Sequence, residues 1–257
     1  MISLLCGLLL CLGPVDGAAS APAPEVQVAV AANFVPALRE IARQFELATG
    51  HTVIVSSGST GRHFAQISAG APFDVFLAAD ARRPRLLVEK GLAVADSRFT
   101  YAMGQLVFFG TLTDEAGADV LTSLQFDHCA IANPRLAPYG RAAQQVLERL
   151  NLWNQMQDKL VRGQNVGQAF QFVASGNAEL GLVSRGQVLL LDQTKHRPLE
   201  VRPVPANLYD PILQQAVLLT RAADNPGARA LLDFLKGKQS RAFIEKHGYF
   251  LPSGDIE

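Results

Sequence analysis

The sequence predicts an α/β protein with two lobes, each a mostly parallel sheet flanked by helices, joined by two crossover strands. Three observations support this prediction. Buried apolar runs alternate with segments of helical periodicity, as in βαβ units, and this alternation starts once near residue 26 and again near residue 129. Two long apolar strands, at 105–110 and 214–220, lie between and after these groups. The chain can therefore leave the first lobe, build the second and return.

The first group begins with an apolar strand and continues in regular alternation. The run "VQVAVAA" reads as a strand buried on both faces, and the next apolar residues recur at helical spacing until Gly50, which suits a helix end. A second helix is expected over 60–69, and a third ends at Gly91. The predicted strands of this group are residues 26–32, 52–57 and 74–79.

The second group repeats the alternation and ends with the return to the first lobe. Its predicted strands are 105–110, 129–133, 179–184, the proline-bearing edge segment 200–205, and 214–220. Its predicted helices, with one after the return, are 138–150, 166–175 and 226–237. The predicted lobes are 25–104 with 217–257 for lobe 1, and 105–216 for lobe 2.

Composition and charge narrow the class of protein. The chain has 257 residues, 49% hydrophobic and 18% charged, which is ordinary for a soluble globular protein. Its 23 basic and 23 acidic side chains give a formal net charge of +0 at pH 7. No basic field therefore indicates a nucleic-acid or membrane-surface partner. A single cysteine after the leader, Cys129, allows no intrachain disulfide and reads as a core residue.

Residues 1–24 read as a signal peptide and linker. The apolar segment 2–12 has the length of a signal-peptide core and is too short to span a bilayer. Gly13 and Pro14 break it, and small residues at 18–21 offer cleavage sites. We expect export to the periplasm without stable membrane insertion after cleavage. A leader without Lys or Arg leaves a buried first helix, an uncleaved anchor or a lipoprotein as alternatives.

Four junctions, at which a strand ends and a helix begins, are candidates for binding an anion. The first N–H groups of a helix lack intrahelical partners and carry the positive end of its dipole, and ligands of α/β sheets bind at the carboxyl ends of strands. Each junction alone is typical of ordinary capping, and the prediction depends on two in each lobe facing one cleft. The candidates are Asn33 and Asn165 as N-caps, Ser59 and Thr60 as hydroxyl donors, and the main-chain N–H groups of Tyr139 with Gly140 and of Val166 with Gly167.

Such a cleft would suit a small, dehydrated oxyanion bound by neutral donors. Helix-terminus effects of about 0.3–1 kcal/mol each and charge-assisted hydrogen bonds of roughly 1.5–3 kcal/mol each can sum to micromolar or tighter binding. No arginine is then obligatory. Arg62 and Arg141 lie near the junctions and read as solvated residues that can steer the ligand.

The sequence contains no catalytic motif. A nucleophile elbow, a P-loop, a dinucleotide fingerprint and histidines at metal-ligand spacing are all missing from it. Ser59 and His63, four residues apart on one helix, could act as nucleophile and base, so an enzyme is kept as the alternative. A signalling or adhesion domain that has lost its ligand is a further alternative, against which the intact junctions argue.

Several motifs resemble the periplasmic molybdate-binding proteins of ABC transporters over about residues 25–252. They are "VAVAANF", "SSGSTGRHFAQISAGAPFDVFLAAD", "ANPRLAPYGRAA", "NVGQAFQFVASGNAELGLVS" and "GYFLP". The resemblance implies the two-lobed fold of type II periplasmic binding proteins, which closes over molybdate or tungstate by a hinge motion. It also implies a transporter permease as partner, a monomer, and no cofactor, with molybdenum present only as the bound oxyanion.

The same resemblance assigns the ligand positions. Asn33, Ser59 with Thr60, the N–H of Tyr139 and the N–H of Val166 match positions that bind the oxyanion. Gly104 and residues 210–211 become the expected flexing points of the hinge.

Two departures from the family pattern leave the choice of anion open. Ala32 and Ser184 stand where some members have Thr and Tyr, which removes two possible hydroxyl donors. A receptor for another oxyanion, such as sulfate, is therefore the alternative within this fold.

Overall fold

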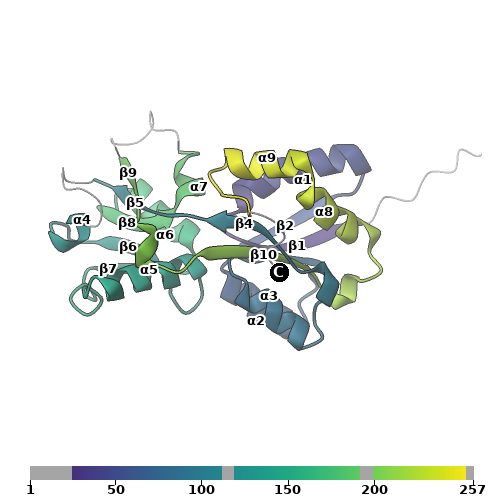
Figure 1. The fold of residues 1–257 in the computed structure, drawn as a ribbon, viewed down its shortest axis with the longest axis horizontal. Helices are drawn as coiled ribbons and strands as arrows, with labels where there is room; N and C mark the ends of the chain where they lie inside the picture. The colour runs from purple at the N-terminus through teal and green to yellow at the C-terminus, as the bar shows by residue number, and fades with distance from the viewer. Residues whose placement is uncertain (1–24, 112–118, 192–198, 253–257) are drawn as a thin grey trace, which may run out of the picture.

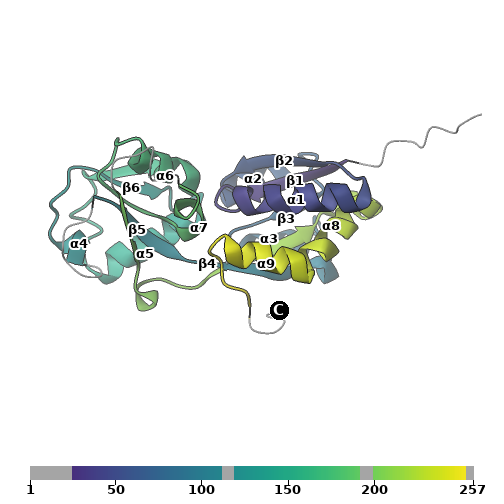
Figure 2. The same cartoon turned by 90° about the horizontal axis from the view of Figure 1, so that it is seen from above.

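The computed structural model describes residues 25–111, 119–191 and 199–252. The expected signal peptide, residues 1–24, lies outside these ranges. Within them, no helix is both long enough and apolar enough to cross a membrane. The described chain forms two lobes side by side, each built on a five-stranded sheet with helices on its faces (Figures 1 and 2). The predicted two-lobed α/β class is thus confirmed.

The first lobe has the strand order β2-β1-β3-β10-β4, in which β1 is parallel to β2 and β3 while β10 is antiparallel to β3 and β4. Its strands are β1 (Val26–Ala31), β2 (Val53–Gly58), β3 (Val75–Leu77), β4 (Phe99–Gly104) and β10 (Ile212–Leu218). Its helices are α1 (Val35–Thr49), α2 (Thr60–Ser68), α3 (Arg82–Glu89), α8 (Pro226–Lys236) and α9 (Lys238–Lys246).

Two apolar layers hold this lobe together, one on each face of the sheet. Alternate residues of β1 belong to different layers: Val28 packs with α1, α8 and α9, and Ala29 packs with α2 and α3. Because side chains alternate along a strand, an almost continuous apolar run such as "VQVAVAA", interrupted only by Gln27, is what a sheet covered on both faces requires.

The second lobe repeats this arrangement in the order β7-β6-β8-β5-β9. In both sheets three parallel strands come first, and the fourth place is taken by an antiparallel strand that the chain enters directly from the other lobe. The strands are β5 (Leu106–Gly110), β6 (Cys129–Ala132), β7 (Leu160–Gly163), β8 (Leu180–Ser184) and the edge strand β9 (Glu200–Pro203). The helices are α4 (Asp119–Thr122), α5 (Pro138–Arg149), α6 (Val166–Ala174) and α7 (Arg185–Val188).

The chain crosses between the lobes at two points. The first crossing is Gln105, between the end of β4 and the start of β5. The second is residues 209–211, between a short 3-10 turn (Ala206–Leu208) and β10. We predicted that residues up to 216 belong to lobe 2, and this is wrong for residues 212–216. They pair with the first sheet from Ile212, opposite Gly104, onward, so main-chain hydrogen bonds return the chain to lobe 1 before the apolar run that marked the strand in the sequence.

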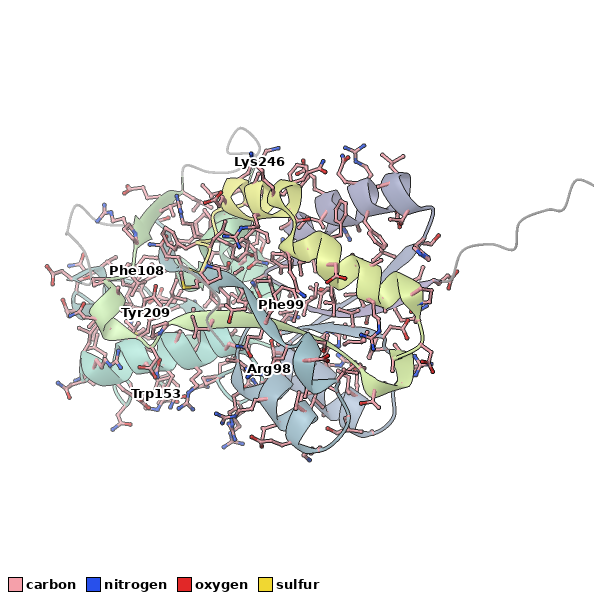
Figure 3. All side chains as sticks on the ribbon, turned by 45° about the vertical axis from the view of Figure 1, so that its right-hand side comes forward. Arg98, Phe99, Phe108, Trp153, Tyr209 and Lys246 are labelled. Carbon is pink, nitrogen blue, oxygen red and sulfur yellow. The ribbon has the colours of Figure 1, made fainter. Side chains whose placement is uncertain are left out.

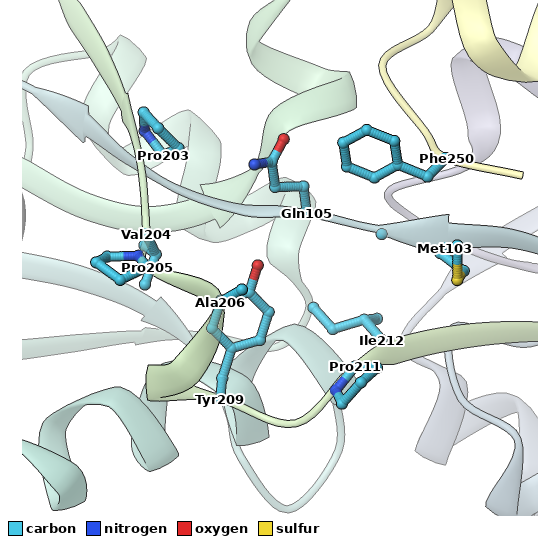
Figure 4. A pocket seen from close by; sticks show the side chains of 11 residues that line it. Met103, Gln105, Pro203, Val204, Pro205, Ala206, Tyr209, Pro211, Ile212 and Phe250 are labelled. Atoms are coloured by element: carbon cyan, nitrogen blue, oxygen red, sulfur yellow. The ribbon is translucent and has the colours of Figure 1, made fainter.

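Both crossings border a hollow of about 510 Å³ (Figure 4). Met103, Pro211 and Phe250 line it on the side of the first lobe, and Tyr209 lies at its other end, where its hydroxyl accepts a hydrogen bond from the N–H of Leu106 at 3.2 Å. Figure 3 shows Tyr209 beside the segment that leads into β10. The hollow therefore lies beside both crossings, while Tyr209 itself packs into the apolar core of the second lobe.

Candidate functional site

The four junctions predicted from the sequence meet in one cavity between the lobes. The cavity has a volume of about 10 Å³, far below the roughly 300–1,000 Å³ of typical small-molecule pockets. In this conformation it suits a small ion and excludes a sugar or a peptide. No charged residue of the described ranges lines it. The lining residues are Ala31, Ala32, Asn33, Gly58, Ser59, Thr60 and Ala79 from the first lobe, and Ala137, Pro138, Tyr139, Asn165 and Val166 from the second.

Main-chain N–H groups supply most of the donors around the cavity. Those of Asn33, Thr60, Tyr139 and Val166 have no hydrogen-bond partner among the described residues. Each residue lies at or just before the first turn of a helix, where unpaired N–H groups and the positive end of the helix dipole coincide. The cavity therefore concentrates positive potential without a cationic side chain.

Asn33 is not the N-cap that we predicted. That position belongs to Phe34, whose N–H donates to the carbonyl of Ala31 at 2.9 Å, so the chain makes one more turn before α1 begins. The Asn33 side chain is buried and donates instead to Gln214 Oε1 at 2.8 Å and to the Tyr249 hydroxyl at 3.3 Å. Tyr249 in turn donates to the Asn33 carbonyl at 2.6 Å. Asn33 is thus held by β10 and by the C-terminal segment.

At the second junction, Ser59 caps α2. Its Oγ accepts a hydrogen bond from the Arg62 N–H at 3.3 Å, which leaves the hydroxyl hydrogen for a ligand. Thr60 is fully buried, and its Oγ1 accepts the N–H of Ala79 at 3.0 Å. The Thr60 hydroxyl therefore ties the end of β3 to the start of α2.

The two junctions of the second lobe begin their helices where the sequence predicts. Pro138 opens α5, and Ala137 before it makes no side-chain cap. Asn165 caps α6, because its Oδ1 accepts the N–H of Gln168 at 3.0 Å. This leaves the N–H groups of Tyr139 and Val166 at the cavity.

The lobes touch around the cavity. The N–H of Gly61 donates to the carbonyl of Leu136 at 2.8 Å, and the Arg83 guanidinium donates to the carbonyl of Arg135 at 3.2 Å. The structure is therefore a closed form, in which first-lobe donors reach second-lobe acceptors.

A family model of bacterial extracellular solute-binding proteins matches residues 26–250. The chain belongs to this family. The molybdate-binding protein ModA of Azotobacter vinelandii is 50% identical over 254 residues, which are 98% of this chain and 96% of that protein. The ModA of Rhodobacter capsulatus is 44% identical over 232 residues, 89% of each chain. The solved structure of an Azotobacter vinelandii periplasmic molybdate-binding protein has a TM-score of 0.82 at 40% identity and covers 89% of this chain and 100% of that one.

As a solute-binding protein the chain is not an enzyme, and the surroundings of Ser59 agree with that. His63, the base of the alternative hypothesis, is buried, and its Nδ1 lies 3.2 Å from Gln66 Oε1. Burial lowers the pKa of its imidazole. No hydrogen bond joins His63 to the Ser59 hydroxyl in the described structure.

Three aspartates could serve as general acid and base only as a pair of neighbouring carboxylates. Asp74, Asp80 and Asp210 are instead each paired with a different arginine. Within the described ranges, no group of three or more His, Cys, Asp or Glu side chains could hold a metal ion.

The two departures from the family pattern have structural explanations. A Cβ on Gly167 would lie 3.5 Å from that of Ala32, so the methyl group of Ala32 faces a close approach of the second lobe. Ser184 does not line the cavity, and its Oγ donates to the Tyr139 hydroxyl at 3.2 Å. Burial raises the pKa of Tyr139 well above its usual range, which keeps this phenol protonated.

Proposed function

We propose that this solute-binding protein captures molybdate between its lobes in the periplasm and delivers it to the membrane part of an ABC transporter. The observation that carries the proposal is the meeting of four helix N-termini, two from each lobe, around a cavity of about 10 Å³. Two relatives at 50% and 44% identity are named molybdate-binding proteins. The protein acts as a monomer and needs no cofactor.

The donor set favours a fully ionised tetrahedral oxyanion. Unpaired N–H groups and the Ser59 hydroxyl can only donate to such a ligand, and no carboxylate of the described ranges lines the cavity to accept a proton from it. This disfavours phosphate, which is partly protonated at neutral pH. Tungstate has the same charge and nearly the same size as molybdate, so we propose that it binds as well. Sulfate has the same charge and a smaller radius, and it is the alternative ligand.

Isothermal titration of the dialysed mature protein tests this function. We expect sub-micromolar binding of molybdate and tungstate and no measurable binding of sulfate or phosphate. The variant Ser59→Ala should bind molybdate about 10-fold to 100-fold more weakly, because one hydrogen bond to a charged group contributes roughly 1.5–3 kcal/mol. Tight sulfate binding would transfer the function to another anion. No binding of any oxyanion by folded protein would refute the proposal.

Exposed arginines near the cavity are expected to accelerate binding. A hollow of about 830 Å³ shares Ala79, Ala137 and Pro138 with the cavity, and the exposed Arg135 and Arg141 line it. Charges around a cleft raise association rates in a salt-dependent way.

The double variant Arg135→Ala with Arg141→Ala tests this steering by stopped-flow kinetics with molybdate. It should associate several-fold more slowly at low salt, with an unchanged dissociation rate and a smaller salt dependence. The control removes the same charge far from the hollow, on α8 and α9, by Arg229→Ala with Arg241→Ala. Equal effects of both pairs would contradict local steering.

A further inference from the structure

The contact between the lobes at the first crossing is unusually close. Gly104 is the last residue of β4, directly before the crossing. A Cβ added to it would lie 2.2 Å from the hydroxyl oxygen of Tyr139 and 2.9 Å from Cζ of the same ring. A real side chain cannot approach a neighbour so closely. The phenol of the second lobe thus lies directly against the main chain of the first.

The Tyr139 side chain cannot easily move away from this contact. Its relative exposure is 1%, and its hydroxyl accepts a hydrogen bond from Ser184 at the end of β8. An aromatic ring has few alternative rotamers, and a closely packed interior offers no space for them. Tyr139 therefore behaves as a rigid spacer between α5 and the crossing.

The same point also connects to the ligand-binding turn of the first lobe. Gln214 Nε2 would lie 3.1 Å from a Cβ on Gly104, and Gln214 Oε1 accepts the hydrogen bond from the Asn33 amide. Gln214 is fully buried on β10, the strand that follows the second crossing. Gly104 thus lies between a residue that holds Asn33 and the ring of Tyr139.

We propose that the Tyr139 side chain is a strut between the lobes, which stops closure where its phenol meets Gly104. This contact sets the distance between the Tyr139 N–H and the donors of the first lobe, so Tyr139 and Gly104 are positioning residues for the oxyanion. The inference rests on the proposed function, but it assigns a role to the side chain of Tyr139 that is separate from its main-chain N–H.

A double-mutant cycle tests the strut. Gly104→Ala places a methyl group where the phenol must sit, and Tyr139→Phe removes the atom nearest to it while keeping the main-chain N–H. If obstruction lowers the closed population about tenfold, the apparent affinity for molybdate falls about tenfold. Tyr139→Phe alone removes both the stop and the hydrogen bond with Ser184, so it should also weaken molybdate binding, by about threefold to tenfold. Added to Gly104→Ala, it should restore about threefold or more of the lost affinity.

Gly50→Ala is the control for a general loss of stability. Gly50 has φ +73° and open space around it, so alanine there strains only the end of α1. This variant should have a lower Tm and an unchanged affinity. Wild-type affinity in Gly104→Ala, or no recovery in the double variant, would overturn the strut.

A second readout separates this inference from the proposed function. Ser68→Cys and Glu148→Cys place spin labels at exposed positions on α2 and α5. The short interlobe distances should become less populated in Gly104→Ala and recover in the double variant, with or without molybdate. Absence of molybdate binding in the wild-type protein would refute the function alone, whereas distances that do not respond to Gly104→Ala would refute the strut alone.

Discussion

The variant Gly140→Ala is expected to lose high-affinity binding and to be less stable than the wild-type protein. A Cβ on Gly140 would lie 2.2 Å from the Ala132 carbonyl oxygen, 2.7 Å from the Ala132 carbonyl carbon and 2.8 Å from that of Asn133. All three atoms belong to the main chain that ends β6, so no side chain can rotate away. The first turn of α5 has to move off the strand.

This displacement acts on the site because Tyr139 precedes Gly140. Its N–H would leave the cavity, and the loss of hydrogen bonds worth roughly 1.5–3 kcal/mol each lowers the molybdate affinity about 100-fold or more. Overpacking costs about 1–3 kcal/mol of stability and lowers Tm by several degrees. Titration calorimetry and thermal unfolding of the ligand-free protein measure the two effects.

Gly176→Ala in the same lobe is the matched control for Gly140→Ala. Gly176 has φ +82° and nothing near its missing side chain, so alanine there should reduce stability without changing affinity. Wild-type affinity in Gly140→Ala would show that the start of α5 does not contribute to the site.

The variant Asn33→Asp is expected to abolish molybdate binding. The substitution keeps the shape of a buried side chain that lines the cavity and replaces its NH₂ donor with a carboxylate oxygen. At about 5 Å and an effective dielectric constant of about 20, repulsion amounts to roughly 3 kcal/mol for each unit of ligand charge. The new oxygen also faces Gln214 Oε1, which had accepted the amide hydrogen bond. We expect an affinity loss of more than about 1,000-fold.

Asn33→Ala is the neutral comparison for this variant. It removes the amide that donates to Gln214 and Tyr249 and adds no charge, so the turn that presents the Asn33 N–H is held less firmly and the loss should be about 10-fold to 100-fold. Protonation of the new carboxyl should restore part of the binding to Asn33→Asp as the pH falls, which titrations at acidic and neutral pH measure. Equal affinities of the Asp and Ala variants at neutral pH would place Asn33 away from the anion.

Local patterns predicted most of the secondary structure because the residues of each of these elements carry its signal, either an apolar run or a residue typical of a helix start. The run at β1 is apolar except for Gln27 at its start, as suits a strand between two helical layers, and Pro138 and Asn165 mark the starts of α5 and α6 by local backbone and capping chemistry. The strands β4 and β7 were missed. β7 is only four residues with the sequence "LVRG", and β4, "FTYAMG", is an edge strand directly before the apolar run of β5, so pairing with neighbours rather than composition defines them as strands.

The sequence also failed to predict side-chain directions and pairings between distant residues. The sequence placed Asn33 correctly at the end of β1 but assigned it to the wrong partner, because Gln214 lies 181 residues away and Tyr249 lies 216 residues away. The return to the first lobe before Ile212 depends in the same way on pairing with Gly104.

The sequence by itself determined the α/β class, the family resemblance and the starts of α2, α5 and α6 with their unpaired N–H groups, since these depend on residues within a few positions of one another. Only the tertiary structure decided that the starts of α1, α2, α5 and α6 meet in one cavity, and that the ring of Tyr139 rests on Gly104. Both depend on the two crossings, after which the chain adds an antiparallel strand to the sheet of the other lobe. The distance between the lobes is set by packing between residues that are far apart in the chain, so the local spacing of residues cannot predict it.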